Sequence, residues 1–178
     1  MEKFQNSIEF NEIITNLKNK NFLEALKKIK PASVNYPNEN IILKLYAIIY
    51  FNLNQWENAI KYYKKILNFE KETYKIFTNI GVSYFKLGKI NQSIDAFKNS
   101  IKNNPNFGLA HNNLGISYLE LGMYEKALDQ FITALKLNDN DYQAQTNLIN
   151  TFNLNKPKVN DEHPLIEIND KIEKLTQN

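Results

Sequence analysis

Two pairs of glycines in this chain lie 34 residues apart: Gly81 with Gly115, and Gly88 with Gly122. A fixed period of this length indicates a repeated supersecondary unit, because each copy folds in the same way. Segment 108–141 reads as two amphipathic helices joined at a turn around Gly122. One such helix pair cannot bury both of its faces, so the period predicts an all-α chain of stacked helix pairs.

Small residues stand in this segment where the two helices must touch, and large apolar residues flank them. The order Leu-Gly, Tyr, Gly-x-Tyr, Ala, Phe, Ala resembles the tetratricopeptide repeat, a helix–turn–helix unit of 34 residues. The matching residues are Leu114, Gly115, Tyr118, Gly122, Tyr124, Ala127, Phe131 and Ala134. His111 and Asp139 stand where the family pattern has Trp and Pro.

The same step divides most of the chain into repeats within one predicted domain, 1–178. The units are 6–39, 40–73, 74–107 and 108–141, and a half unit 142–153 follows them. Asn54 replaces the turn glycine of the second unit, which is acceptable because Asn also adopts a left-handed backbone. The first unit is degenerate: Ile13 replaces a glycine, and Pro31 predicts that the second helix ends or kinks there.

A polar linker, 154–163, and a last amphipathic helix, 164–176, follow the half unit. The family resemblance implies a right-handed α-solenoid whose concave side is lined by the first helix of each pair. The last helix has two interpretations. It caps the open end of the stack, as terminal repeats require, or it belongs to a downstream domain or occupies the groove itself.

The composition narrows the classes of partner. The chain of 178 residues has 22 lysines, no arginine and no cysteine. Arginine reads guanine edges and clamps phosphates with two hydrogen bonds, so its absence argues against nucleic-acid binding, and the lysines are scattered among acidic residues. No apolar run is long enough for a signal peptide or a spanning helix, which leads us to expect a cytoplasmic protein without membrane insertion.

The sequence offers no catalytic, cofactor-binding or metal-binding pattern. Its only histidines, His111 and His163, have no partner at metal-ligand spacing, and we interpret His111 as a packing residue. All five glycines belong to the repeat, so none remains for a phosphate-binding loop. We therefore predict a non-enzymatic protein.

Asparagine recurs at the sixth position of the units. That position reads Asn11, Leu45, Asn79, Asn113 and Asn147. An amide both donates and accepts, so a row of asparagines can hold a peptide backbone whatever its side chains. Such a row resembles that in the repeat region of O-linked N-acetylglucosamine transferases. The alternative is that this asparagine belongs to the family consensus and makes contacts between helices.

Two further positions are apolar in the first four units. The ninth position reads Ile14, Ile48, Val82, Ile116 and Asn150, and the twelfth reads Leu17, Phe51, Phe85, Leu119 and Asn153. If they face the groove, they form an exposed apolar strip that marks a binding site. The alternative, favoured for the twelfth position, is packing between neighbouring helices.

Some family members hold a chaperone's C-terminal carboxylate in a clamp of Lys, Asn and Arg. Lys44 and Asn79 match two clamp positions, whereas Ile48, Leu109 and Asn113 do not. The sequence therefore does not predict that specificity. The predicted peptide-binding groove comprises Asn11, Lys44, Ile48, Lys75, Asn79, Val82, Phe85, Lys86, Asn113, Ile116, Glu120, Asn147 and Asn150.

The leading hypothesis is a protein-interaction module whose concave groove binds an extended peptide or a helix of a partner. In it the asparagines hold the backbone, the apolar residues hold side chains, and Lys44, Lys75, Lys86 and Glu120 tune the charge. Two alternatives stay open. The chain is the substrate-recruiting repeat region of a longer glycosyl-, sulfo- or hydroxyl-transferring enzyme, or it is a small secretion or assembly chaperone.

Overall fold

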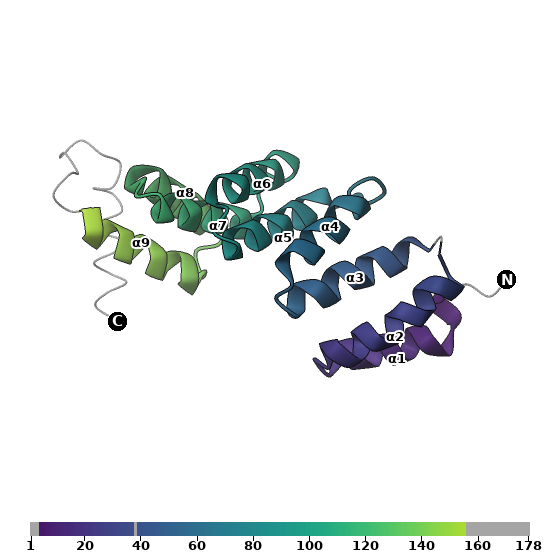
Figure 1. Ribbon diagram of the computed structural model, residues 1–178. Coiled ribbons are helices and arrows are strands. Elements are labelled where there is room, and N and C mark those ends of the chain that lie inside the picture. The colour runs from purple at the N-terminus through teal and green to yellow at the C-terminus, as the bar shows by residue number, and fades with distance from the viewer. Residues whose placement is uncertain (1–3, 38, 156–178) are drawn as a thin grey trace. The chain divides into compact units, whose positions relative to one another are not determined.

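The computed structural model describes residues 4–37 and 39–155, and this part of the chain is entirely helical (Figure 1). Its elements are η1 (Phe4–Asn6), α1 (Ile8–Lys18), α2 (Phe22–Asn35), α3 (Asn40–Asn52), α4 (Trp56–Ile66), α5 (Thr73–Lys86), α6 (Ile90–Asn103), α7 (Gly108–Glu120), α8 (Tyr124–Leu137) and α9 (Tyr142–Asn155). Helix α9 extends two residues into the predicted linker. The predicted C-terminal helix, 164–176, lies outside the described residues.

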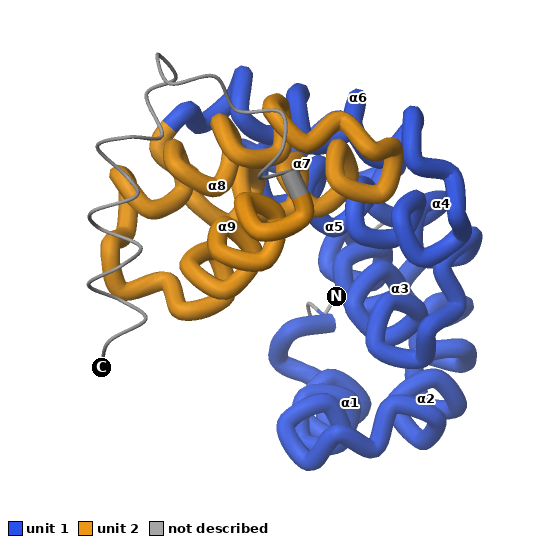
Figure 2. Tube along the Cα trace, turned by 90° about the vertical axis from the view of Figure 1, so that its left-hand side faces the viewer, with its two compact units in different colours: residues 1–105 blue, residues 106–178 orange. Residues whose placement is uncertain are grey.

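The helices form two compact units, each of which packs its helices in chain order (Figure 2). Unit 1, residues 1–105, holds η1 and α1 to α6; unit 2, residues 106–178, holds α7, α8 and α9. Within each unit, every α-helix packs against the next, and in unit 2 α7 also contacts α9. The predicted all-α architecture of sequentially stacked helix pairs is confirmed.

The turn inside each pair has the same backbone conformation in all four copies. Its left-handed residues are Lys20 (φ 59°), Asn54 (φ 58°), Gly88 (φ 70°) and Gly122 (φ 68°). In each copy the N–H of the next residue donates to a carbonyl of the preceding helix: Asn21 to Asn16 at 2.8 Å, and Gln55 to Tyr50, Lys89 to Tyr84 and Met123 to Tyr118 at 2.9 Å. These bonds satisfy carbonyls that the helix end leaves open. The prediction that Asn54 replaces the turn glycine is confirmed.

The predicted close contact between the two helices of a pair is also present. A Cβ added at Gly81 would lie 2.5 Å from Cε1 of Phe97, and one added at Gly115 would lie 2.5 Å from Cε1 of Phe131. Both phenylalanine rings are buried. The ring therefore lies directly on the backbone of the facing helix, which only a glycine at that position permits.

Helix α2 does not end at Pro31 but continues to Asn35, so the prediction that the helix ends there is wrong, and the alternative, a kink at Pro31, stays a prediction. Pro31 itself is exposed, while Ile29 and Ala32 on either side of it are fully buried. Packing of these neighbours against the core offsets the backbone hydrogen bond that the proline removes, a loss of about 3 kcal/mol in a helix interior.

Replacing Gly115 with alanine tests the glycine–phenylalanine contact. The added methyl must displace the buried ring of Phe131, so we expect Gly115→Ala to lower the free energy of unfolding by about 1–3 kcal/mol. Gly108→Ala on the same helix is the matched control, because its Cβ would meet nothing closer than 3.5 Å. Urea denaturation followed by circular dichroism would measure both, and equal midpoints for the two variants would contradict this account of the pair.

Candidate functional site

The predicted groove residues lie on the first helix of each pair. In unit 1 these helices are α1, α3 and α5, and in unit 2 they are α7 and α9. Residues that recur at one position of the repeat, such as the sixth or the ninth, occupy the equivalent face of each first helix. Their surroundings within each unit show which of them are available to a partner.

Asn79 is already engaged inside unit 1. Its Nδ2 donates to the hydroxyl of Tyr63 on α4 at 3.1 Å, which is a contact between successive helix pairs. Tyr63 is buried, and burial raises the pKa of this phenol to about 12, although the hydrogen bond from Asn79 opposes the rise. Asn79 therefore provides a buried hydroxyl with the partner that it needs.

Asn147 has a comparable internal bond in unit 2. Its Nδ2 donates to Oδ1 of Asn112 on α7 at 3.0 Å. Asn112 is fully buried, and its own Nδ2 finds no hydrogen-bond partner in the described part of the chain. Sequence reasoning missed Asn112; the signal that could have identified it is its place beside the asparagine row, at the fifth position of the unit.

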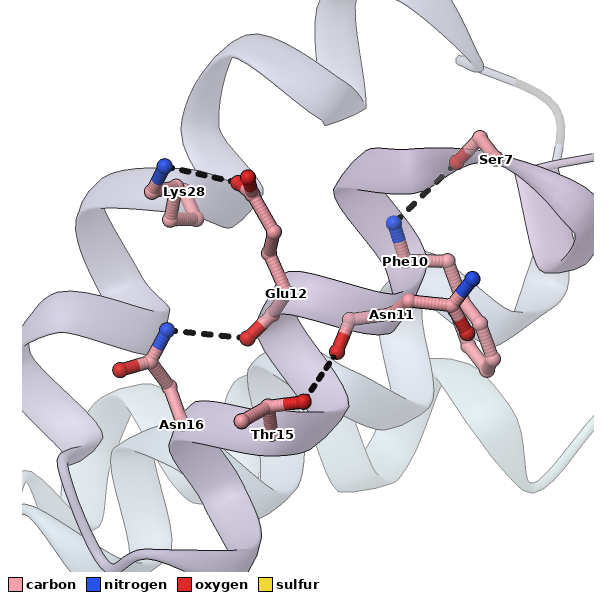
Figure 3. A network of polar contacts seen from close by, with 7 residues as sticks. All are labelled: Ser7, Phe10, Asn11, Glu12, Thr15, Asn16 and Lys28. Atoms are coloured by element: carbon pink, nitrogen blue, oxygen red, sulfur yellow. Dashed lines mark hydrogen bonds and ion pairs between the residues drawn. The ribbon is translucent and has the colours of Figure 1, made fainter.

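Asn11 lies on the exposed side of α1, in a polar network shown in Figure 3. Its main-chain oxygen accepts from Oγ1 of Thr15 at 2.8 Å, and Glu12 accepts from Nζ of Lys28 at 2.7 Å. An open cavity of about 450 Å³ here is lined by Ile8, Asn11, Glu12, Thr15, Asn16 and Lys28.

The predicted charged residues differ in how far neighbours neutralise them. Lys44 on α3 forms an ion pair with Glu70, and the two side chains are only 36% and 26% exposed. The pair of Lys75 with Glu72 is 2.7 Å long and lies in solvent, where it raises the pKa of Lys75 and lowers that of Glu72. Lys86 and Glu120 are exposed, as is Asn150.

The apolar residues of the ninth position are partly open. Ile48 is 41% exposed, although Ile42, Leu45 and Ile49 of the same helix are buried. Val82 is half-buried, and so is Ile116, which packs against the core of unit 2.

The twelfth position is largely used for packing. Leu17, Phe51 and Leu119 are half-buried against the three core clusters, which supports the packing interpretation. Phe51 also makes edge contacts with the rings of Trp56 and Tyr63. Phe85, the predicted groove residue of this position, is half-buried.

The described residues contain no group of three His, Cys, Asp or Glu side chains that could hold a metal ion. His111 is buried, and its Nδ1 lies 3.0 Å from Oε1 of Gln130, which agrees with a packing role; His163 lies outside the described residues. Within residues 4–37 and 39–155, no helix combines the length and apolar character needed to cross a bilayer. What the site offers is amide, apolar and ammonium groups suited to non-covalent recognition.

Models of the tetratricopeptide repeat match residues 45–69, 74–107 and 108–141, which together make up more than half of the chain. Among curated proteins the comparison finds no match.

Solved structures of this fold resemble the chain at low sequence identity. The MamA RS-1 ArsTM double mutant aligns with a TM-score of 0.77 at 18% identity, over 96% of this chain and 93% of that one. The first TPR of Spaghetti (RPAP3), bound to the HSP90 peptide SRMEEVD, aligns with a TM-score of 0.61 at 22% identity, over 65% and 91%. The Arabidopsis OM64 TPR domain gives 0.61 at 16% identity, over 65% and 95%. At such identities the likeness establishes the fold.

The buried phenol of Tyr63 predicts a pH dependence of stability. An unfolded tyrosine ionises near pH 10, whereas Tyr63 in the fold ionises near 12. The unfolded state therefore loses its proton first as the pH rises, so the stability held below about pH 10 declines by on the order of 2 kcal/mol by pH 12. Tyr63→Phe removes this contribution, and urea titrations at several pH values should show a shallower decline for the variant. Parallel declines in the two proteins would contradict the assignment.

Proposed function

The chain belongs to the tetratricopeptide repeat family, and on that premise we propose that it is a non-enzymatic module that binds an extended peptide or a helix of a partner protein. Domains of this family are generally protein-interaction scaffolds. Each unit has its own proposed contact surface, formed by the sixth and ninth positions of its first helices: α3 and α5 in unit 1, and α7 and α9 in unit 2.

The observation that carries the proposal is the exposure of Ile48. Helix α3 buries Ile42, Leu45 and Ile49 almost completely, yet leaves Ile48 with 41% of its surface in solvent. Covering an exposed apolar side chain of this size on binding is favourable by about 1 kcal/mol. Val82, at the same position of α5, extends the apolar surface to the next pair of unit 1.

In this proposal Asn79 and Asn147 offer the ligand only the carbonyl oxygen of the side-chain amide. Because Nδ2 of Asn79 already donates to Tyr63, its carbonyl oxygen is the group proposed to accept a backbone N–H of the ligand. Asn147 likewise offers its carbonyl oxygen to the ligand, because its Nδ2 donates to Asn112. Asn113, half-buried on α7, is proposed to hold the backbone in unit 2.

The charges favour an uncharged or apolar ligand segment over an acidic one. RPAP3, which shares the fold, binds a peptide that ends in Glu-Glu-Val-Asp. In this chain Glu70 already neutralises Lys44, the lysine at a clamp position, and Ile48 stands where the clamp needs an asparagine. We therefore propose that the ligand contributes an apolar side chain next to Ile48 and no carboxylate at Lys44.

Replacing Ile48 with glutamate tests the apolar contact. We expect Ile48→Glu to weaken partner binding about tenfold or more, because a charge must be desolvated where an apolar side chain was covered. Partners would be captured from native lysate, identified by mass spectrometry, and titrated against the purified proteins. Met123→Glu is the matched control, because Met123 is equally exposed at 41% and lies outside the proposed surface. An equal loss of partner binding in both variants, or no loss in either, would contradict the proposed site.

Replacing Glu70 with glutamine tests the proposed preference for an uncharged or apolar ligand over an acidic one. The change leaves Lys44 without its carboxylate, so we expect the affinity for the peptide SRMEEVD to rise about fivefold at low ionic strength. Glu57→Gln changes the net charge equally without breaking a described ion pair, so it should leave the affinity unchanged. Fluorescence anisotropy with the labelled peptide would measure all three proteins. Tight binding by the unmodified chain would contradict the proposed preference.

A further inference from the structure

Positive charge is divided unevenly between the two units. Residues 1–105 hold sixteen lysines against nine acidic residues, whereas residues 106–178 hold six lysines against ten acidic residues. The small net charge of +3 therefore conceals a strongly basic unit 1. Such an asymmetry indicates an electrostatic partner for one part of a chain.

Within unit 1, the excess gathers on the second helix of each pair. Helices α2, α4 and α6 carry eight lysines and only three acidic residues. Lys30, Lys64 and Lys98 stand at the same position of the three successive repeats, and all are exposed. We call these three side chains, together with the exposed Lys61 and Lys65 of α4 and Lys102 of α6, the lysine face.

Within the described part of unit 1, no ion pair neutralises a lysine of the lysine face. The ion pairs described in unit 1 engage Lys27, Lys28, Lys44 and Lys75, and none of them includes Lys30, Lys64 or Lys98. Lys64 and Lys65 lie over the rings of Tyr84 and Tyr62, with Nζ 5.6 and 5.4 Å from the ring centroids, which leaves their charge in place.

Helix dipoles account for Lys64, Lys65 and Lys102, which lie in the last turn of their helices, but not for the rest of the lysine face. The dipole favours cations only within the last turn of a helix, but Lys30 and Lys98 stand further in, with five residues of their helix still to follow. Helix α8 of unit 2 has the same fold and the same dipole. At the position that follows Lys98 by one repeat, α8 has Ile132; its two lysines are Lys126, near its start, and Lys136, in its last turn.

From this geometry we propose that the lysine face of α2, α4 and α6 binds an extended, carboxylate-rich segment of a partner protein. The segment crosses the three helices in turn and places a carboxylate against Lys30, Lys64 and Lys98. This surface is separate from the proposed groove, because it lies on the second helices, whereas the groove residues of unit 1 lie on α1, α3 and α5.

The chemistry of the face favours protein carboxylates over the other polyanions. Nucleic-acid surfaces combine arginine forks with exposed aromatic rings, but the chain has no arginine, and Tyr62 is stacked on Tyr46 and Tyr50. Membrane-surface helices need an apolar face beside their lysines. Among the described residues, α4 and α6 expose no large apolar side chain, whereas α2 exposes Leu23 and Val34, so this argument applies to the part of the lysine face on α4 and α6.

The test compares two triple variants of the full chain with equal net charge. Lys30→Gln/Lys64→Gln/Lys98→Gln removes the repeated lysines, and Lys18→Gln/Lys71→Gln/Lys89→Gln removes three exposed lysines elsewhere in unit 1. The probe is a fluorescein-labelled peptide of repeated Gly-Glu-Glu, with a repeated Gly-Gln-Gln peptide as its uncharged counterpart. Anisotropy at low and physiological salt would report affinity, and circular dichroism would report folding.

We expect the first variant to bind the glutamate peptide about tenfold more weakly than the unmodified chain, and the second variant to bind within about twofold of it. Ile48→Glu should leave this binding unchanged, so failure of the groove proposal would not affect the result. Equal losses in the two triple variants, or equal binding of the glutamine peptide, would overturn the proposal. Lysine-face-dependent binding to phosphatidylserine vesicles or to oligothymidine that exceeds binding to the glutamate peptide would overturn it in favour of a membrane or a nucleic acid.

Discussion

The contact on which the helix pairs depend is a phenylalanine ring lying on the bare backbone of a glycine. At Gly81 and Gly115 the rings of Phe97 and Phe131 occupy the space that any Cβ would need. Within each unit, neighbouring pairs then pack against one another, α2 on α3 and α4 on α5 in unit 1, and α8 on α9 in unit 2. The pair centred on α3 reaches a similar arrangement with Ala47, which is fully buried. In the α5–α6 and α7–α8 pairs, this contact sets how closely the two helices approach.

The elements that depend on local chemistry could be predicted from the sequence. The turn glycines fix the left-handed backbone, and Asn54 could be assigned to the same role because its side chain tolerates that conformation. Pro31 shows where local chemistry is insufficient. Its cost to α2 is real, but the burial of Ile29 and Ala32 decides the outcome, and burial depends on residues far away in the chain.

The sequence predicted which positions form the candidate site, but it could not predict which polar groups at those positions a partner can still reach. Periodicity placed Asn79 and Asn147 on the first helices of their pairs, yet it could not show that the side-chain N–H groups of these residues donate to Tyr63 and Asn112. Nor does any local pattern connect Lys44 with Glu70, since the two residues come from α3 and from the segment after α4. Contacts between non-adjacent segments decide which polar groups a partner can still reach.

One repeat can therefore contribute to two separate binding surfaces, because the first helix has more of its side chains committed to internal contacts than the second helix has. The first helix lies between neighbouring pairs, so its polar side chains are drawn into internal hydrogen bonds and its apolar side chains into packing. The second helix needs only its inner stripe for the core, marked in α6 by buried Ile94 and Phe97, so its outer positions are free to vary. That freedom permits Lys30, Lys64 and Lys98 to recur in unit 1 while the corresponding residue of α8 is Ile132. Charge on the second helices can then change from one repeat to the next without disturbing the contacts inside each pair, such as those of Gly81 with Phe97 and Gly115 with Phe131.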